Sequence, residues 1–303
     1  MGPANSTLSL QNPRISLVTP NLNYHKHIRS TLDSVIRQAY PNLDYIVVDG
    51  GSTDGSLEIV DDFSSAGVRC LVKAGLDQYE SINLGFEMTN GEIMGWINSD
   101  DISLPWTLRV VAEIFSTFPQ LDWIMGAPAV IQGGAVQKVG PARPFFREAL
   151  QLCLYEGGDT FGIVQQESCF WRRSLWEKAG PLRPDIGMAA DFELWSRFAR
   201  HAELVACEAL LGGFSNHGKN RSIVGYEEYR RSIAGVVDRL PRQELERRKH
   251  LSSWHRRYNQ FRNWPGLKRL TRMIGGLSEL YGKILRRDFN THRFNLVDER
   301  LFP

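Results

Sequence analysis

The chain has 303 residues, of which 42% are hydrophobic and 23% are charged. These values are ordinary for a globular protein, so disorder throughout is excluded and one large α/β domain with an appendage is expected. Charge is spread unevenly, because residues 225–303 carry 18 Lys and Arg against 9 Asp and Glu, whereas residues 1–224 carry 18 against 25. A basic C-terminal segment on an acidic body predicts an anionic partner, such as a membrane surface.

The four cysteines and the polar N-terminus predict a cytoplasmic protein. No pair of cysteines has metal-ligand or Cys-x-x-Cys spacing, which favours reduced thiols. Residues 1–13 are polar, and no window approaches about 18 consecutive apolar residues, so we expect neither a signal peptide nor a membrane-spanning helix. Contact with the inner face of a membrane is expected to be peripheral.

Strands and helices are predicted to alternate in the first part of the chain. Strands are expected at residues 14–19, 44–48, 68–72 and 92–97, and helices at 26–39, 56–64, 78–88 and from Leu104 to about 118. This alternation is typical of a doubly wound, mostly parallel α/β sheet of the Rossmann-like kind.

The rest of the chain is less regular and ends in predicted helices. Residues 121–140 are expected to form strands with Gly turns, residues 143–165 an irregular loop, and residues 166–178 a strand followed by a helix. A helix is expected at 190–201 and a strand near 203–208. From residue 226 a helical extension is predicted from two apolar stripes, Leu251, Trp254, Tyr258 and Phe261, then Leu267, Leu270, Ile274, Leu277, Tyr281 and Ile284.

Three polar motifs follow three predicted strands. They are Thr19-Pro20-Asn21, Asp49-Gly50-Gly51-Ser52 and Asn98-Ser99-Asp100-Asp101. Ligands of such sheets bind beyond the carboxyl ends of the strands, so we expect one site there. The acidic pair has the oxygen ligands that Mg²⁺ or Mn²⁺ prefers, although a plain turn or helix N-cap is the alternative. The glycine motif lets backbone approach a flat ligand, with a tight turn as its alternative.

Two further residues are candidates for chemistry. Asp191 begins a predicted helix among apolar neighbours, which suits a buried general base, and an N-cap is the alternative. His217 follows a glycine-rich run and can ligate a metal or contact a phosphate, while a loop histidine without function is equally compatible with the pattern.

Taken together, the motifs resemble the family 2 glycosyltransferases of the GT-A fold. The resemblance rests on the order and spacing of TPNLNY (19–24), SVIRQAYPNLDYIVVDGGSTDGS (34–56), NGEIMGWINSDD (90–101), QESCFWRRSLWEKAG (166–180), AADFELW (189–195) and GGFSNHG (212–218). It implies a catalytic domain over residues 14–224. Residues 225–303 are then a basic helical extension that caps this domain, joins two copies into a homodimer or docks on an anionic membrane.

The resemblance also implies a reaction. An inverting enzyme would move a sugar from a UDP-, GDP- or dTDP-sugar to a hydroxyl of a glycan or lipid-linked acceptor, in cell-surface polysaccharide or glycoconjugate biosynthesis. Asp191 takes the position of the base, and Asp101 and His217 those of ligands to Mn²⁺ or Mg²⁺. The implied nucleotide contacts are Thr19, Pro20, Asn23, Asp49, Gly50, Glu80, Asn83 and Asp100. The implied acceptor and donor-sugar contacts are Gln166, Glu167 and Trp195.

Two stretches depart from the pattern of the family. Residues 75–83 lack the acidic and basic anchors that are usual there, and Glu80 stands in place of the usual Asp, so recognition of the base or the donor sugar is expected to differ. Glu167 stands where proline is favoured, and a carboxylate beside the acceptor position is expected to select an unusual acceptor.

Three other functions are compatible with parts of the sequence. A metal-dependent nucleotidyltransferase would need an early Gly-rich basic phosphate loop, which TPNLNYHK is not. A catalytically inactive module that binds sugar nucleotides is disfavoured by the presence of both Asp101 and Asp191. A nucleic-acid binder is suggested by the basic, aromatic C-terminal segment, but the acidic body argues against it, so no nucleic acid is expected as a partner.

Overall fold

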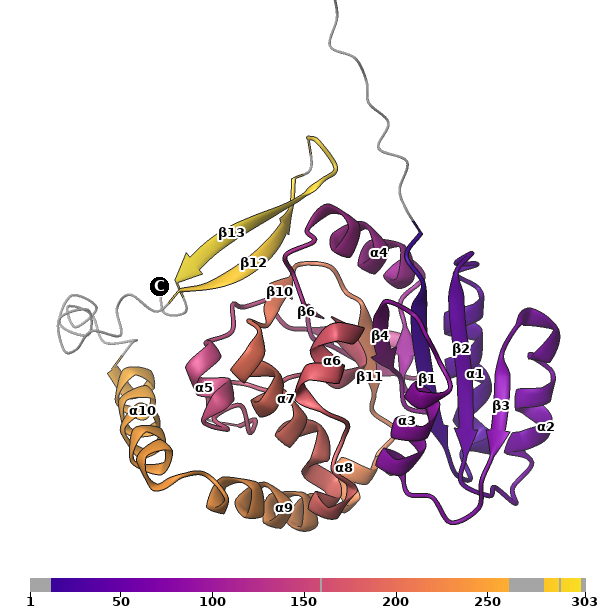
Figure 1. Cartoon of the computed structure of the whole chain (residues 1–303), viewed down its shortest axis with the longest axis horizontal. Coiled ribbons are helices and arrows are strands. Elements are labelled where there is room, and N and C mark those ends of the chain that lie inside the picture. The colour runs from indigo at the N-terminus through magenta and orange to yellow at the C-terminus, as the bar shows by residue number, and fades with distance from the viewer. Residues whose placement is uncertain (1–11, 159, 262–280, 289, 301–303) are drawn as a thin grey trace, which may run out of the picture.

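The central element of the protein is a nine-stranded mixed sheet with the strand order β13-β12-β10-β6-β9-β4-β1-β2-β3 (Figure 1). The computed structural model describes residues 12–158, 160–261, 281–288 and 290–300. In the first part of the sheet, β1 pairs in parallel with β2 and β4, and β2 pairs in parallel with β3. The strands there are β1 (Ile15–Asn21), β2 (Leu43–Asp49), β3 (Arg69–Val72) and β4 (Ile93–Trp96).

Helices connect these strands and cover both faces of the sheet. One face is covered by α1, α2 and α4, and the other by α3, α6 and α7. Their bounds are α1 (His25–Ile36), α2 (Ser56–Asp61), α3 (Gln78–Glu87), α4 (Thr107–Thr117), α6 (Arg173–Ala179) and α7 (Ala190–His201). Successive strand residues alternate between the two cores, as Leu17 and Val18 do. The predicted doubly wound, mostly parallel sheet is confirmed.

The second half of the sheet is mixed. Strand β9 (Cys169–Arg172) lies between β4 and β6 (Trp123–Gly126) and is antiparallel to both. Strand β10 (Val205–Cys207) then continues in parallel with β6. The connections there include α5 (Arg147–Gln151), which falls inside the segment predicted to be irregular, and the 3₁₀ turns η2 (Gln166–Ser168) and η3 (Pro184–Ala189). A further 3₁₀ turn, η1 (Ser64–Ala66), lies between α2 and β3 in the first half.

A small second sheet with the order β5-β11-β7-β8 lies next to the ends of the main strands. Its strands are β5 (Ile102–Ser103), β7 (Ala129–Gln132), β8 (Ala135–Val139) and β11 (Gly212–Ser215). Strand β5 begins directly after Asp101 and is antiparallel to β11, with Ile102 opposite Gly213. This pairing brings the loop after β11 to the acidic pair, although more than 100 residues separate the two in the chain.

The C-terminal part contains helices, as expected, and also a hairpin that was not expected. The helices are α8 (Arg221–Val224), α9 (Tyr226–Asp238) and α10 (Arg242–Phe261), and the first apolar stripe lies on α10. Residues 262–280, which hold most of the second stripe, lie outside the described residues. The prediction of a helix at Tyr281 and Ile284 is wrong, because both lie on β12.

The hairpin consists of β12 (Tyr281–Arg287) and β13 (Phe294–Arg300) and extends the main sheet through the parallel pairing of β12 with β10. Its strand character follows from alternation, since Ile284 and the adjacent Leu285 are buried in cores on opposite faces. The boundary at residues 224/225 stays a prediction, but two strands from beyond it belong to the sheet.

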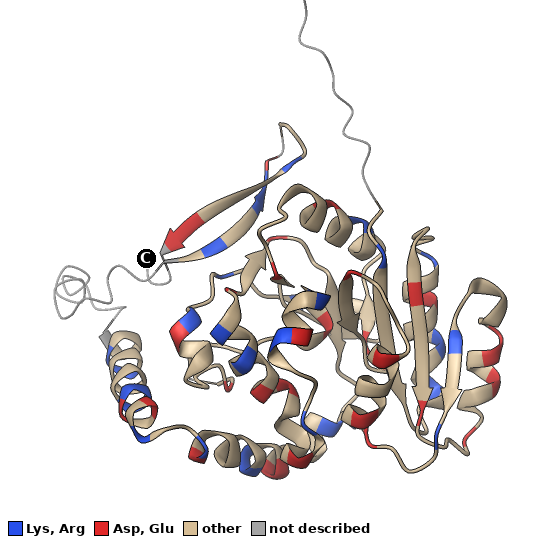
Figure 2. Ribbon diagram, viewed as in Figure 1, with Lys and Arg blue, Asp and Glu red and all other residues tan. Residues whose placement is uncertain are grey.

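Ion pairs connect some of the charged side chains of the C-terminal part to the body. Figure 2 shows Lys and Arg interleaved with Asp and Glu along α10 and the hairpin. The pairs that join these elements to earlier residues are Arg247–Glu148, Arg248–Glu156, Arg200–Glu244, Lys283–Glu203 and Arg286–Glu208. These pairs hold α10 and the hairpin against the body, and the cap stays a prediction.

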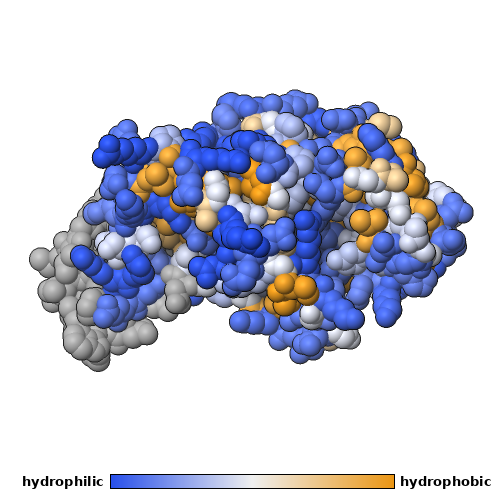
Figure 3. Space-filling model, turned by 90° about the horizontal axis from the view of Figure 1, so that it is seen from below, coloured by the Kyte–Doolittle hydropathy of each residue, from blue (hydrophilic) through white to orange (hydrophobic). Residues whose placement is uncertain are grey.

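Apolar side chains on the surface gather in separate patches among polar ones, as the view from below shows (Figure 3). On α8 and the start of α9, Ile223, Val224 and Tyr226 are exposed. Among the helices within the described ranges, none is both long and apolar enough to cross a membrane. Docking on a membrane and dimer formation stay predictions.

Candidate active site

The three polar motifs lie together at the carboxyl edge of the main sheet. The parallel register places Asn21, the last residue of β1, opposite Asp49, the last residue of β2. The Ser99 hydroxyl after β4 donates to the carbonyl of Pro20 at 2.6 Å. These contacts connect the ends of three neighbouring strands, so their polar residues form one continuous surface of the kind that binds ligands in α/β sheets.

Asp49 shapes the turn after β2. Its carboxylate is fully buried, and it accepts hydrogen bonds from the amides of Gly51 and Ser52 at 2.9 and 2.6 Å and from the side chains of Ser52 and Asn21 at 2.7 and 2.6 Å. A Cβ atom at Gly50 would lie 3.0 Å from the Leu76 carbonyl, so a larger residue there would require the backbone at Leu76 to shift by a few tenths of an ångström. A direct contact of Asp49 with a nucleotide base stays a prediction.

Asn21 and Asn23 complete the edge around this turn. The Oδ1 atom of buried Asn21 has no hydrogen-bond partner within the described part of the chain. Asn23 adopts a left-handed conformation (φ 59°), and its Oδ1 accepts from the Thr53 amide at 2.9 Å. A buried acceptor without a partner costs free energy, so Asn21 is a candidate for contact with a ligand N–H.

Three predicted nucleotide contacts have other partners in the structure. Thr19 is fully buried, and its hydroxyl lies 2.8 Å from the hydroxyl of Tyr45 in the core, so it lines no open pocket. Glu80 accepts from the Asp77 amide and forms the capping box of α3. The side-chain amide of Asn83 donates to the Leu182 carbonyl and accepts from its amide, at 2.9 and 3.0 Å. These contacts give each of the three residues a structural role, and their contact with a nucleotide stays a prediction.

Asp100, between β4 and β5, lies next to His217, in the loop after β11. The Nε2 atom of His217 lies 2.9 Å from Oδ2 of Asp100, and Asn220 donates to the same oxygen at 3.3 Å. His27 of α1 stacks on His217 with ring centroids 4.4 Å apart. Burial and the adjacent His217 lower the pKa of His27, which favours the neutral form of the His27 imidazole. The metal was expected at Asp101 and His217, but the histidine is next to Asp100.

Asp101 is directed into the protein. Its carboxylate accepts from the Ser215 amide at 3.0 Å and from the Asn98 side chain at 3.2 Å, and the residue is 2% exposed. Burial, with the charges of Glu167 and Asp100, raises its pKa well above the usual range. Both carboxylate oxygens of Asp101 accept hydrogen bonds from the protein, whereas Asp100 lies beside His217. We therefore expect Asp100 to be the cation ligand, and the role of Asp101 stays a prediction.

Two of the expected sugar and acceptor contacts, Gln166 and Glu167, are buried. Gln166 is buried, and its side chain donates to the Trp96 carbonyl at 2.6 Å and accepts from Asn98 at 3.2 Å. Glu167 is also buried, and burial raises its pKa, to which the charges of Asp100 and Asp191 contribute. Contact of these two with substrate stays a prediction, although both lie beneath the site.

Trp195 belongs to the core and not to an open sugar site. It is 3% exposed and stacks on Trp96 and Trp123 with ring centroids 5.5 and 5.3 Å apart. Tryptophans 171 and 195 also meet edge to face. The aromatic cluster therefore fixes α7 against the sheet and holds Asp191, four residues earlier, at a constant position.

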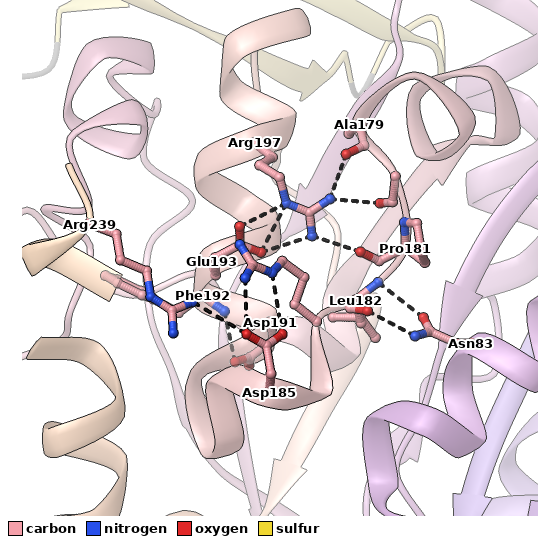
Figure 4. A network of polar contacts seen from close by, with 12 residues as sticks. Asn83, Ala179, Pro181, Leu182, Asp185, Asp191, Phe192, Glu193, Arg197 and Arg239 are labelled. Carbon is pink, nitrogen blue, oxygen red and sulfur yellow. Dashed lines mark hydrogen bonds and ion pairs between the residues drawn. The ribbon is translucent and has the colours of Figure 1, made fainter. Parts of the chain in front are cut away.

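Asp191 lies in the first turn of α7, where its Oδ1 accepts the Phe192 amide at 2.8 Å (Figure 4). Burial raises its pKa to about 6, while hydrogen bonds from the Phe192 amide and from Tyr79 oppose the rise. The residue as a whole keeps partial exposure. A carboxyl group with a pKa near neutrality has the protonation behaviour of a general base.

Polar contacts on both sides support the start of α7 (Figure 4). Arg197 forms a bidentate pair with Glu193 at 2.9 Å and also donates to the carbonyls of Ala179, Gly180 and Pro181. One guanidinium thus joins α7 to the segment that leads into η3. Together with the bonds between Asn83 and Leu182, it holds the carboxylate of Asp191 in a rigid frame.

Several polar residues at this edge were not among the predicted contacts. They are Asn21, His27, Gln78, Asn98, Asn220 and Arg221. Asn21 and Asn98 belong to two of the polar motifs, but their contacts were not predicted, because the partners of these residues come from distant elements.

The donor set at Asp100 and His217 fits a divalent cation that is shared with a substrate. A carboxylate oxygen and an imidazole nitrogen converge there, and both are ligands for Mn²⁺. In the described ranges no group of three His, Cys, Asp or Glu side chains could hold an ion. A cation held by one or two side chains usually completes its coordination with water and substrate phosphates. The residues therefore fit an ion that binds together with a diphosphate.

Comparisons with known proteins agree with this architecture. A family model described as glycosyl transferase family 2 matches residues 16–163. An uncharacterized glycosyltransferase of Nostoc sp. is 23% identical over 66% of this chain, and the chain spans only 60% of that relative's length. The PGL/p-HBAD biosynthesis glycosyltransferase of Mycobacterium tuberculosis is 33% identical over 64% of this chain and 72% of its own length.

Solved structures show the same fold. The Staphylococcus aureus TarS fragment 1-349 in complex with UDP-GlcNAc has a TM-score of 0.61 and 16% identity, over 88% of this chain and 76% of that chain. The Pyrobaculum calidifontis mannosyltransferase PcManGT, in complex with GDP-Man and Mn²⁺, has a TM-score of 0.55 and 17% identity, over 80% and 70%. The solved structures show the GT-A fold. The family match and the mycobacterial relative show that the chain belongs to the family 2 glycosyltransferases.

Proposed function

We propose that the protein transfers a sugar from a nucleotide-sugar donor to a hydroxyl of a glycan or lipid-linked acceptor, with inversion at the anomeric carbon. The observation that carries this proposal is the pair of separate acidic centres at one sheet edge. One is Asp191, a partly exposed residue whose carboxyl group has a pKa of about 6, and the other is Asp100 beside His217. The names of the mycobacterial relative and of the UDP-GlcNAc complex support it by analogy.

Asp191 would act as the general base. Its ionised carboxylate takes the proton of the acceptor hydroxyl as that oxygen attacks the anomeric carbon. The new C–O bond forms on the face opposite the diphosphate, the bond to the diphosphate oxygen breaks, and its electron pair leaves with the diphosphate. A single displacement of this kind inverts the anomeric centre, and base catalysis typically contributes about 10²–10⁴ in rate.

Asp100 and His217 would hold a Mn²⁺ or Mg²⁺ ion at the donor diphosphate. When it is bound, such an ion neutralises charge on the leaving group. Asn220 orients Asp100 through its hydrogen bond, and His27 supports the His217 ring from one side. Asp101 anchors the Ser215 amide and so positions the loop that carries His217. The nucleoside would lie along Gly50–Ser52 and Asn21.

Asp191→Asn tests the proposed transfer directly. The variant should lose about 10²–10⁴-fold in kcat, because the amide cannot accept the proton, while donor affinity stays unchanged. Radiolabelled sugar transfer to glycan and lipid-linked acceptors measures the rate. Asp185→Asn, which removes an exposed carboxylate of η3, serves as the matched control. Near-normal transfer by Asp191→Asn would exclude Asp191 as the base, and a wild-type chain that binds donor without transfer would favour the inactive binding module.

The pH dependence of stability follows from the same carboxyl group. Because its pKa is about 6 in the folded chain and lower when unfolded, ionisation of Asp191 lowers the stability of the wild type as the pH rises through about 6. Asp191→Asn should therefore raise the melting temperature at pH 8 and leave it close to the wild type at pH 4. Thermal unfolding at both pH values measures this difference, and an equal difference at the two would contradict it.

The cation assignment is tested by comparing the two adjacent aspartates. Asp100→Asn should weaken Mn²⁺ binding in the presence of UDP, GDP or dTDP at least about tenfold, the equivalent of ~1.4 kcal/mol, because it removes a charged ligand. Asp101→Asn should change it little, since that carboxyl faces inward. Electron paramagnetic resonance of Mn²⁺ reports both affinities. The reverse order of effects would return the ligand role to Asp101.

A further inference from the structure

Arg221 introduces a positive charge at the acidic edge that the proposed mechanism does not use. It begins α8 directly after Asn220, whose side chain donates to Asp100 at 3.3 Å and to the Ser215 carbonyl at 2.7 Å. The backbone on one side of Arg221 is therefore fixed to the residues proposed to hold the cation.

The guanidinium of Arg221 is held by a chain of amides on its other side. Its Nη1 donates to Oε1 of Gln78 at 2.9 Å, and Nε2 of Gln78 donates to Oδ1 of Asn98 at 2.8 Å. Asn98 in turn donates to Asp101. Gln78 thus connects the start of α3, the end of β4 and the start of α8, and it places an arginine at the point where these three elements meet.

This arginine has charge and donors left for a ligand. It is exposed, and across the described ranges it forms no ion pair with a carboxylate. A guanidinium has five N–H donors. Burial raises the pKa values of Tyr24, Tyr79 and Asp191, and the charge of Arg221 opposes each rise. The guanidinium is therefore within electrostatic reach of Asp191 and of Tyr24, whose pKa the charges of Asp100 and Asp101 also raise.

The stretch at residues 75–83 lies next to Arg221 and contributes Gln78 to this place. It departs from the expected pattern because it lacks a basic residue, and it contains Gln78. The structure supplies a cation to this place from α8, through the Gln78–Arg221 bond. A neutral amide at position 78 suits that arrangement, because a carboxylate there would pair with the guanidinium and compete with an anionic ligand.

We propose that Arg221 binds the diphosphate of the donor and that Gln78 is the positioning residue that holds it there. The proposal rests on the proposed function. The planar fork of arginine matches phosphate oxygens in a bidentate way, which a flexible lysine does not reproduce. A positive charge at this place also stabilises the negative charge that remains on the diphosphate when the bond to the sugar breaks.

The test separates phosphate binding from a purely structural role of Arg221. UDP, GDP, dTDP and their nucleosides are titrated by NMR into the full chain with Mg²⁺, and the diphosphate that the wild type binds best is used. Arg221→Gln should bind it roughly 10- to 100-fold more weakly but bind the matching nucleoside unchanged. Arg221→Lys should be intermediate. Arg230→Gln, which removes another exposed arginine from α9, is the control and should match the wild type.

Gln78→Ala should also lower the affinity for the diphosphate, but by less than Arg221→Gln does. The double variant should bind the diphosphate no more weakly than Arg221→Gln alone. Equal diphosphate affinity in Arg221→Gln and the wild type would overturn the proposal. A parallel loss of nucleoside affinity would also overturn it, because Arg221 would then only support the fold. A wild-type chain that binds none of the three diphosphates would refute donor binding itself, and the proposed function with it.

Discussion

Negative charge buried at the carboxyl edge of the central sheet is the constraint on which the site depends. Asp101, Glu167 and Asp191 lie there with raised pKa values, which burial causes first and which, for Asp101 and Glu167, neighbouring carboxylates increase. Within the residues that the structure describes, none of the three forms an ion pair with Lys or Arg. Burial of carboxylates without a cation costs free energy, so their concentration at one edge indicates a site that binds positive charge together with its ligand.

The fold distributes these carboxylates among different tasks. Asp101 is directed inward and ties the loop after β11 to the strand ends, which brings His217 to Asp100. Asp191 belongs to another element, α7, whose start is fixed by the Arg197 contacts and by the tryptophan cluster. In the proposed function, separation of the two centres would allow one to act as a base with a pKa near neutrality while the other binds a cation. Arg221 reaches the same edge from α8 and contributes charge of the opposite sign.

The sequence predicts the parts of this arrangement that depend on local pattern. The alternation of apolar strands and amphipathic helices predicts the sheet, and the rule for strand ends predicts that residues near Asn21, Asp49 and Asp100 meet. It does not predict which of two adjacent aspartates faces the ligand, because that depends on the pairing of β5 with β11. It also does not predict that Asn83 bonds to Leu182, 99 positions away, or that Trp195 is covered by the core.

The hairpin at the C-terminus shows the same limit. A helical stripe and a strand can share apolar positions, and the alternation of Ile284 and Leu285 between two cores becomes visible only when β12 is paired with β10. Arg221 and Gln78 are a comparable case, since 143 positions separate them and neither belongs to a recognisable motif. Residues of this kind are identified by contacts and not by spacing.

A crystal structure of the wild-type chain with Mn²⁺ and its preferred nucleoside diphosphate tests the central claim most directly. The account predicts an anomalous peak between Asp100 and His217, a diphosphate that contacts both the ion and Arg221, and a nucleoside along the turn at Gly50–Ser52. An ion bound to Asp101, or a diphosphate bound away from the ends of β1, β2 and β4, would contradict it.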